Sequence, residues 1–597
     1  MRWLVGWSRG AAAGADDGAD GPTVHPVGAQ LLWGDPAPLW AVGDWRPDEV
    51  RVVRADPRGP SAAAADTRLA VLGRCGASDE ALRTGLLAAR GGALRHLTAW
   101  PGSYTAVAQV GRRLTVVGDL AGARPVFHAA WAHGTAYATA ALPLADLIEA
   151  QLDIGHLAAL LACPDSPEAL GDGTPYAGVR RVPPGHALVL RDGARDVTAY
   201  EPTASLAVAA PQLDAREAVM GVRDALVEAV RVRLDAPRHA PSHAYLGRDP
   251  GPVPGMGPAQ RRAARGGGPA PGLGADLSGG SASGTLALLA AGLPGVPGTH
   301  AGLGAGGGER LLAVTFNDLA RDRDAELERA RAIAADPRLR HVIVAAGEEA
   351  LPYAALDGGP LTDEPGPALV SAERDRRRLA AGSADHLTGH GARQVLDAHP
   401  ARLADLLMDR RRRHLLRPVS ALARADGPAT HALFVPFTVY RAARRLARTA
   451  YREGLEAAAT ALQRPGSADG FGEDGVTGAV DASLAALTWC RPGPAARWLT
   501  GEALAEVSIR LQGAAVRPTG LPQRPGERRA AAALARHAAD HRVFEQAAEI
   551  RSQRLHAPFL DNQVVRACRA LPAALRVQPG ARQDIPSSMA RRPPKTA

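Results

Sequence analysis

One stretch near residue 280 combines small and hydroxyl-bearing residues in a pattern that suits the binding of an anion. After Ala275 and Asp276, glycines alternate with hydroxyl side chains, and the apolar run 286–289 follows. Glycine lets a backbone turn tightly and approach a ligand, and a helix that begins here directs N–H groups and its positive dipole end at a phosphate. The residues that we expect to hold the ligand are Leu277, Ser278, Gly279, Gly280, Ser281 and Ser283.

The sequence around this stretch favours a ligand site over an ordinary turn, which is the alternative interpretation of such residues. It is not a G-x-x-x-x-G-K-[ST] loop, because no lysine follows the glycines. Buried-type strands are predicted at 311–316 and 341–344, with a helix at 325–335 between them. This alternation predicts an α/β doubly wound parallel sheet with its ligand at the carboxyl ends of the strands. There Val314, Thr315 and Phe316 would border an adenine.

Length and composition exclude several classes of protein. A chain of 597 residues predicts two or more domains. The net charge of +9 fits an anionic ligand, but no Lys/Arg block with interleaved aromatic residues predicts a nucleic-acid partner. No apolar run reaches the length of a membrane span, and no signal-peptide core is present, so we expect a cytoplasmic protein. Buried free thiols are expected at Cys75, Cys163, Cys490 and Cys568.

The chain divides into an N-terminal β-rich region and a longer C-terminal region. Short strand-like runs at 114–117, 135–138 and 186–190, separated by turn residues, predict a first domain at 1–205. A second domain at 212–597 begins with a helix that Asp214 can cap. Residues 236–274 are rich in Pro, Gly and Arg, and we expect them to be a flexible insertion. The apolar stripe of the first helix comprises Val219, Val222, Leu226, Ala229 and Val230.

The first domain resembles the glutaminase-like domain of asparagine synthetases. The strings 100–107 and 118–127, and the Pro-Pro-Gly turn within 180–186, carry this resemblance. It implies an α+β, Ntn-type β-sandwich. A glutaminase of that type needs a free N-terminal Cys, whose amine is the base for its own thiol. The chain reads Met1-Arg2-Trp3, so we expect a degenerate domain with a structural or partner-binding role.

The second domain resembles the ATP-pyrophosphatase (adenine nucleotide α-hydrolase-like) domain of the asparagine synthetase and β-lactam synthetase superfamily. The Ser-Gly-Gly-x-x-Ser form is similar to the loop that holds pyrophosphate when these enzymes make an acyl-adenylate. Three further segments follow in the family's order. They are 361–367 with Asp363 and Glu364, 386–396 with Gly389, His390 and Gly391, and 554–565 with His556 and Asp561.

Five features make the chain most similar, within this superfamily, to the lasso peptide cyclases. They are the missing N-terminal Cys, the segments 363–369, 386–391 and 556–562, and the arginine-rich stretches 410–417 and 441–452. The resemblance implies that ATP, with Mg²⁺, adenylates an Asp or Glu side chain of a precursor core peptide. The peptide's N-terminal amine then closes a macrolactam ring, and AMP and pyrophosphate leave. A leader peptidase and a leader-recognition protein are the implied partners. The implied catalytic residues are Asp363, Glu364, Arg393 and Lys595, and His556 and Asp561 are implied to bind substrate.

The chain departs from the family pattern at two acidic positions. The loop has Ala282 where the family has an Asp near Mg²⁺, and the second glycine turn has Arg393 in place of another Asp. No metal ligand is therefore assigned, and we hypothesise that Arg393 contacts phosphate directly. After residue 580 the family continues with further helices and a basic catalytic Lys, for which the sole lysine, Lys595, near the end of the sequence, is the only candidate. A catalytically impaired relative that binds precursor peptide or its processing partners, and an asparagine synthetase, are the alternatives.

Overall fold

The computed structural model describes residues 1–10, 24–34, 37–55, 67–201, 214–237, 269–293, 310–317, 324–347, 351, 362–396, 399–410, 415, 419, 435–463, 484–517 and 524–571. These ranges include the serine–glycine loop and the second glycine turn. Lys595, the boundary at 204–212 and most of the predicted insertion 236–274 lie outside them.

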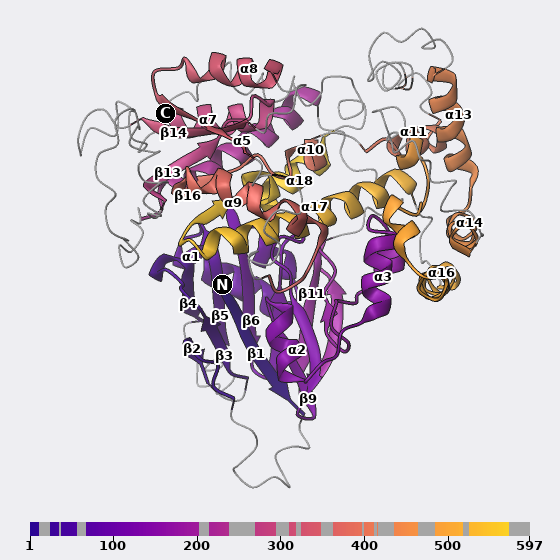
Figure 1. The fold of residues 1–597 in the computed structure, drawn as a ribbon. Coiled ribbons are helices and arrows are strands. Elements are labelled where there is room, and N and C mark those ends of the chain that lie inside the picture. Colours follow the sequence, from indigo (N-terminus) through magenta and orange to yellow (C-terminus); the bar gives the residue numbers. More distant parts are fainter. Residues whose placement is uncertain are drawn as a thin grey trace.

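In these ranges the N-terminal part contains two six-stranded antiparallel sheets packed face to face (Figure 1). Leu4 and Leu39 of the first sheet share a buried cluster with Leu72 and Val107 of the second. The strands predicted at 114–117, 135–138 and 186–190 are confirmed as β7, β9 and β11. The first sheet contains β10 (Arg180–Arg181), β8 (Phe127–Trp131), β9 (Gly134–Ala138), β1 (Trp3–Arg9), β3 (Leu39–Val42) and β2 (Ala29–Trp33). The second contains β12 (Ala194–Ala199), β11 (His186–Arg191), β7 (Arg113–Val117), β6 (Gly102–Val110), β5 (Thr67–Cys75) and β4 (Val50–Arg54).

Helices cover the outer face of each sheet. Leu82 and Leu86 of α1 (Asp79–Arg90) pack on Val71 of the second sheet, and Leu144 of α2 (Ala141–Leu147) packs on Phe127 of the first. The layers therefore run helix, sheet, sheet, helix.

The C-terminal part is built on a parallel sheet, which in the described residues has five strands in the order β15-β14-β13-β16-β17. The chain passes outward from β13 to β15, then returns to β16 on the other side of β13. The order therefore reverses between β13 and β16. Helices pack on both faces of the sheet, which confirms the predicted α/β doubly wound architecture. The strands are β13 (Ala270–Asp276), β14 (Leu311–Asn317), β15 (Leu339–Ala345), β16 (Ser383–Leu387) and β17 (Arg554–His556). The helices are α5 (Ala215–Leu234), α7 (Ser281–Gly292), α8 (Asp324–Ala334), α9 (Ala372–Ala380), α10 (Ala392–Leu396) and α18 (Asn562–Ala570).

The central strand β13 begins inside the stretch that the sequence predicts to be flexible, so the prediction is wrong for residues 270–274. The strand could not be predicted because its glycines leave no alternation of apolar and polar residues, which is the pattern that indicates a strand. The structure shows why glycine is needed: a Cβ at Gly274 would overlap the Ser383 hydroxyl of neighbouring β16. Gly272, at φ +84°, lies where the pairing register with β16 shifts between Ala270 and Leu273.

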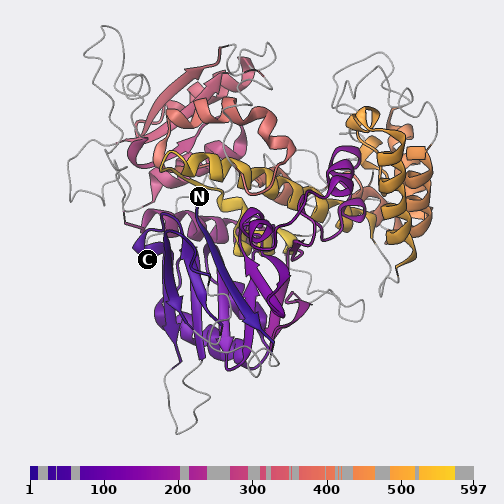
Figure 2. The same cartoon turned by 60° about the horizontal axis from the view of Figure 1, so that its bottom comes forward.

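A group of helices lies beside the two sheet-containing parts. Its members are α11 (Arg402–Met408), α13 (Val435–Arg448), α14 (Tyr451–Gln463) and α16 (Gly501–Val516). Figure 2 shows these orange helices next to α3 (Ile154–Ala162), which lies in the chain between β9 and β10 of the first sheet. Ala159 of α3 shares a buried cluster with Leu455 and Leu511 of the group. The long helix α17 (Pro525–Glu549) runs from this group to the interface between the sandwich and the parallel sheet (Figure 1).

The cysteines are free thiols, as predicted, but two of them meet in the fold. Cys163 follows α3 and Cys490 precedes the α16 segment, and both are buried in the same hydrophobic cluster. Cys568 is also buried, whereas Cys75 is only half-buried.

Helix α5 packs in the same buried cluster as α7 and α18 of the C-terminal part. Its predicted stripe is confirmed, since Val222, Leu226 and Val230 are buried. Asp214 occupies the N-cap position, but its side chain makes no capping hydrogen bond. Near the helix end, Arg233 forms an ion pair of 2.7 Å with Asp561, and both side chains are almost fully excluded from solvent, at 1% and 0% exposure. Two charges in the interior are stable only when each has its partner.

We predict that Arg233→Met lowers the free energy of unfolding by about 3–5 kcal/mol, because it leaves the Asp561 carboxylate buried and uncompensated. Arg231→Met on the same helix breaks only the solvent-exposed pair with Glu228 and is expected to cost less than about 1 kcal/mol. Urea unfolding followed by circular dichroism measures both. Equal losses in the two variants would contradict this assignment.

Candidate active site

The serine–glycine loop lies at the carboxyl end of the central strand, as predicted. Helix α7 begins at Ser281 with Gly280 as its N-cap, so no cap side chain covers the first-turn amides. Gly279 has φ +78°, and a Cβ there would overlap the carbonyl oxygen of Glu326 on α8. The Ser278 and Ser283 hydroxyls are 2.9 Å apart, and the Ser278 amide donates to Ser283 Oγ at 3.1 Å. The loop is thus held in a turn that presents a helix N-terminus, a geometry suited to phosphate.

The second glycine turn, after β16, lies against this loop. A Cβ at Gly389 would be 3.3 Å from the Ser283 amide nitrogen. Gly391 has φ +85°, and a Cβ there would overlap the side chain of Leu560. The two turns therefore meet at the point where the strand order reverses, which is where open α/β sheets bind their ligands. His390 lies between these glycines and is half-buried.

The end of β14 forms the other border of the loop. The Leu277 amide donates to the Val314 carbonyl oxygen at 2.7 Å. The Thr315 hydroxyl donates to the carbonyl oxygen of Leu277 and accepts from His341 Nε2 at 2.6 Å. Phe316 is half-buried, with the guanidinium of Arg374 5.6 Å from its ring centre. Residues 314–316 thus adjoin the loop, as a nucleotide spanning both would require.

Sequence reasoning did not identify Asp276, the acidic residue that comes directly before the serine–glycine loop. Asp276 ends β13 and is buried. His386 Nδ1 accepts from the Ser383 amide, so Nε2 carries the proton and donates to Asp276 at 3.2 Å. Burial raises the pKa of Asp276, but Arg378 and this hydrogen bond outweigh burial and hold the pKa well below its usual value. Only the folded chain brings these partners together.

The structure places Asp363 and Glu364 at the domain interface. Asp363 is buried, accepts from the Ala141 amide at the start of α2 at 3.1 Å, and accepts from Gln546 of α17. Glu364 pairs with Arg181. Burial raises the pKa of Glu364, against the opposing charge of Arg181. In the part of the chain that the structure describes, the partners of these two carboxylates come from the sandwich and α17 and not from the serine–glycine loop.

The remaining candidate residues lie in three separate surroundings. His556 Nε2 is 2.9 Å from Asp385, and burial outweighs this hydrogen bond and lowers the pKa of His556 to about 4. Asp561 is in the buried pair with Arg233. The Arg393 side chain is exposed on α10, and Lys595 lies outside the described residues.

The described residues do not offer Mg²⁺ a carboxylate set at the loop. Ala282 and Arg393 stand where the family has acids, and no group of three or more His, Cys, Asp or Glu side chains in the described ranges is arranged to hold a metal. Mg²⁺ prefers carboxylate and phosphate oxygens, so the protein's own ligands at this loop do not fit the ion.

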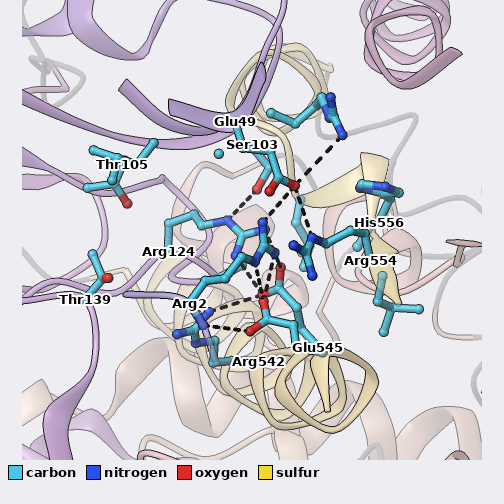
Figure 3. A pocket seen from close by; sticks show the side chains of 18 of the residues that line it. Arg2, Glu49, Ser103, Thr105, Arg124, Thr139, Arg542, Glu545, Arg554 and His556 are labelled. Carbon is cyan, nitrogen blue, oxygen red and sulfur yellow. Dashed lines mark hydrogen bonds and ion pairs between the residues drawn. The ribbon is translucent and has the colours of Figure 1, made fainter. Parts of the chain in front are cut away.

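A buried network of charges joins the two domains around α17 (Figure 3). Arg2 donates to Glu549 through its backbone amide at 2.9 Å and its guanidinium at 2.8 Å. Arg124 makes two hydrogen bonds to Glu545, at 2.6 and 2.7 Å. Burial raises the pKa of Glu545, but the arginines outweigh burial and hold the pKa well below its usual value. These side chains line a cavity of about 40 Å³, little more than the volume of one water.

Comparison with models of known families identifies the family of the C-terminal part. A model of the family described as asparagine synthase matches residues 270–594, more than half of the chain. The match begins at the first residue of β13 and includes both glycine turns and β17. No curated protein matches the sequence. Among the described helices, none is both long enough and apolar enough to cross a membrane.

We predict that Gly279→Ala disrupts the loop, because the new Cβ adds a left-handed backbone strain of about 1–2 kcal/mol and displaces Glu326. Gly280→Ala is the matched control. Its φ is −77°, and its Cβ would be 3.4 Å from Ser278 Oγ, so we expect a change within about 0.5 kcal/mol. Thermal unfolding compares the two, and hydrogen exchange of residues 278–284 shows whether the change is local. A Gly280→Ala effect as large as that of Gly279→Ala would refute this interpretation.

Proposed function

The chain belongs to the asparagine synthase family, and from that premise we propose that it is a lasso peptide cyclase. Family membership indicates an ATP-dependent amide ligase. The proposed reaction has two steps. An Asp or Glu side chain of the core peptide attacks ATP and becomes an acyl-adenylate, releasing pyrophosphate. The peptide's N-terminal amine then attacks the acyl carbon, forming a macrolactam and releasing AMP and a proton.

One observation carries the proposal: the Ser278–Ser283 turn and the Gly389–Gly391 turn meet at the carboxyl ends of β13 and β16. A helix N-terminus there stabilises the negative charge of a leaving pyrophosphate. The peptide specificity rests on the resemblance of segments 363–369, 386–391 and 556–562, and of the arginine-rich stretches 410–417 and 441–452, to lasso peptide cyclases. The leader peptidase and the leader-recognition protein belong to this proposal.

The chain's own residues account for part of the charge balance at such a site. Family enzymes use ATP, typically with Mg²⁺, which neutralises phosphate charge when bound. The acids that would share that ion are replaced by Ala282 and Arg393. Arg393 is exposed on the short helix that follows the second glycine turn, and a guanidinium there can pair with a phosphate.

We predict that Arg393→Ala weakens ATP binding about tenfold, which corresponds to about 1.4 kcal/mol. The control is Arg331→Ala, which removes an exposed arginine of α8 paired with Glu328 and is expected to leave ATP affinity unchanged. Isothermal titration calorimetry with a non-hydrolysable ATP analogue measures both. An unchanged affinity in Arg393→Ala discards the phosphate contact.

The decisive test of the proposed reaction incubates the protein with ATP, Mg²⁺ and a leader-free core peptide. We expect a peptide product lighter by one water, with one AMP formed per product. Peptide binding without AMP formation would favour the catalytically impaired relative, an alternative that Ala282 and Arg393 support. Pyrophosphate release that depends on free aspartate would instead favour an asparagine synthetase.

A further inference from the structure

A larger cavity lies beside α17, away from the charge network. Its volume is about 330 Å³, within the range of about 300–1,000 Å³ that ligand cavities occupy. One wall is a face of α17 with Ala532, Ala539 and Val543 at helical spacing. Segments 164–184 of the N-terminal part and 362–367 of the synthetase part form the other walls. Both domains therefore contribute to the cavity.

Proline dominates these walls. Seven lining residues are prolines, among them Pro183, Pro184, Pro365 and Pro367. A proline has no N–H to donate and keeps a fixed φ. Such walls are rigid and offer apolar contact, so they select an occupant by shape and not by backbone hydrogen bonding.

The charges in the cavity are unbalanced. Five carboxylate side chains and three guanidinium groups line it. Each guanidinium faces a carboxylate of this lining, and Arg542 also pairs with Glu545 outside it, at 3.4 Å. The pairs are Arg181 with Glu364, Arg536 with Asp165, and Arg542 with Asp363 at 4.0 Å.

Asp540 is the carboxylate left over, since Asp172 pairs with Arg180. Within the described residues Asp540 has no hydrogen bond or ion pair closer than 4 Å, and only the more distant charge of Arg536 acts on it favourably. Burial raises the pKa of Asp540 against that charge. Asp540 is half-buried, and partial removal from water disfavours a carboxylate that lacks a partner, so a cation in the cavity would be stabilised.

We propose that this cavity captures the N-terminal end of the peptide substrate, with the α-ammonium group paired to Asp540 and the first side chains against the proline walls. The proposal rests on the proposed function, which requires a free N-terminal amine. A chain end needs only one opening into a cavity between two domains, whereas a charged side chain within the peptide would need two.

The position of the cavity suits a holding site for the reacting amine. The same helix α17 carries His537, whose ring stacks on His390 of the second glycine turn at 5.1 Å between centres. The cavity and the second glycine turn thus both border α17, and a helix is about 10–12 Å in diameter. A peptide spans about that distance with three or four extended residues. Capture therefore keeps the amine at a high effective concentration near the strand ends.

The test uses the probe Gly-Leu-Pro-Gly amide, labelled with a fluorophore at its C-terminal end, and its N-acetylated form. Fluorescence anisotropy without ATP measures binding to the full chain at pH 7. We expect the free-amine probe to bind at least tenfold more tightly than the acetylated one. Asp540→Asn should abolish that difference, and Ala539→Trp, which fills the cavity, should abolish binding of both. Asp224→Asn, an exposed acid on α5, is the control and should change nothing.

The outcomes separate this inference from the proposed function. Failure of the free-amine probe to bind, equal affinity of the two probes, or an unchanged preference in Asp540→Asn would overturn the cavity assignment. ATP binding is measured in parallel on the same samples. If the unmodified chain does not bind ATP, that result counts against the proposed function, whatever the affinities of the two peptide probes are.

Discussion

Two buried carboxylates on α17 govern how the domains are joined. Glu545 and Glu549 are enclosed at the interface, and each is neutralised by a guanidinium from the N-terminal sandwich, Arg124 and Arg2. A buried ion loses its hydration, and removing its partner costs several kcal/mol. Separating the domains would leave both pairs broken. The sandwich and the synthetase part therefore act as one body, with α17 fixed between them.

That fixed helix relates the other candidate elements to each other. Gln546 and Arg542 approach Asp363, which in turn holds the first amide of α2 in the sandwich. On the same helix, His537 contacts His390 beside the serine–glycine loop. Helix α17, which contacts both domains, thus positions the strand ends and the larger cavity. This gives the sandwich a role in shaping the site.

Local patterns in the sequence predicted the elements well. Strand β14, helix α8 and the start of α7 follow directly from apolar runs and from glycine and hydroxyl spacing. The same patterns predicted the parallel sheet and the position of the serine–glycine loop at its strand ends. The first half of β13 was not predicted, because a glycine there is required by the close approach of Ser383, a residue more than a hundred positions later. Partners at that range leave no local signal.

The same limit applies to individual side chains. Asp363 has the sequence context of a turn acid, yet its partners come from α2 and α17. Asp276 directly precedes the loop, but its histidine and arginine lie on β16 and α9. Cys163 and Cys490 are far apart in the sequence and are neighbours in the fold. Contact between segments that are distant in the sequence, which decides each case, is a property of the folded chain.

The bond between Arg2 and Glu549 also has a consequence for biosynthesis. The two residues are separated by 547 positions, and a ribosome adds about 5–20 residues per second. The first strand must therefore wait roughly 30–110 s after leaving the tunnel before its partner exists. During that interval the Arg2 guanidinium can pair with Glu49 of the sandwich, whereas its contact with α17 forms only after Glu549 has been made.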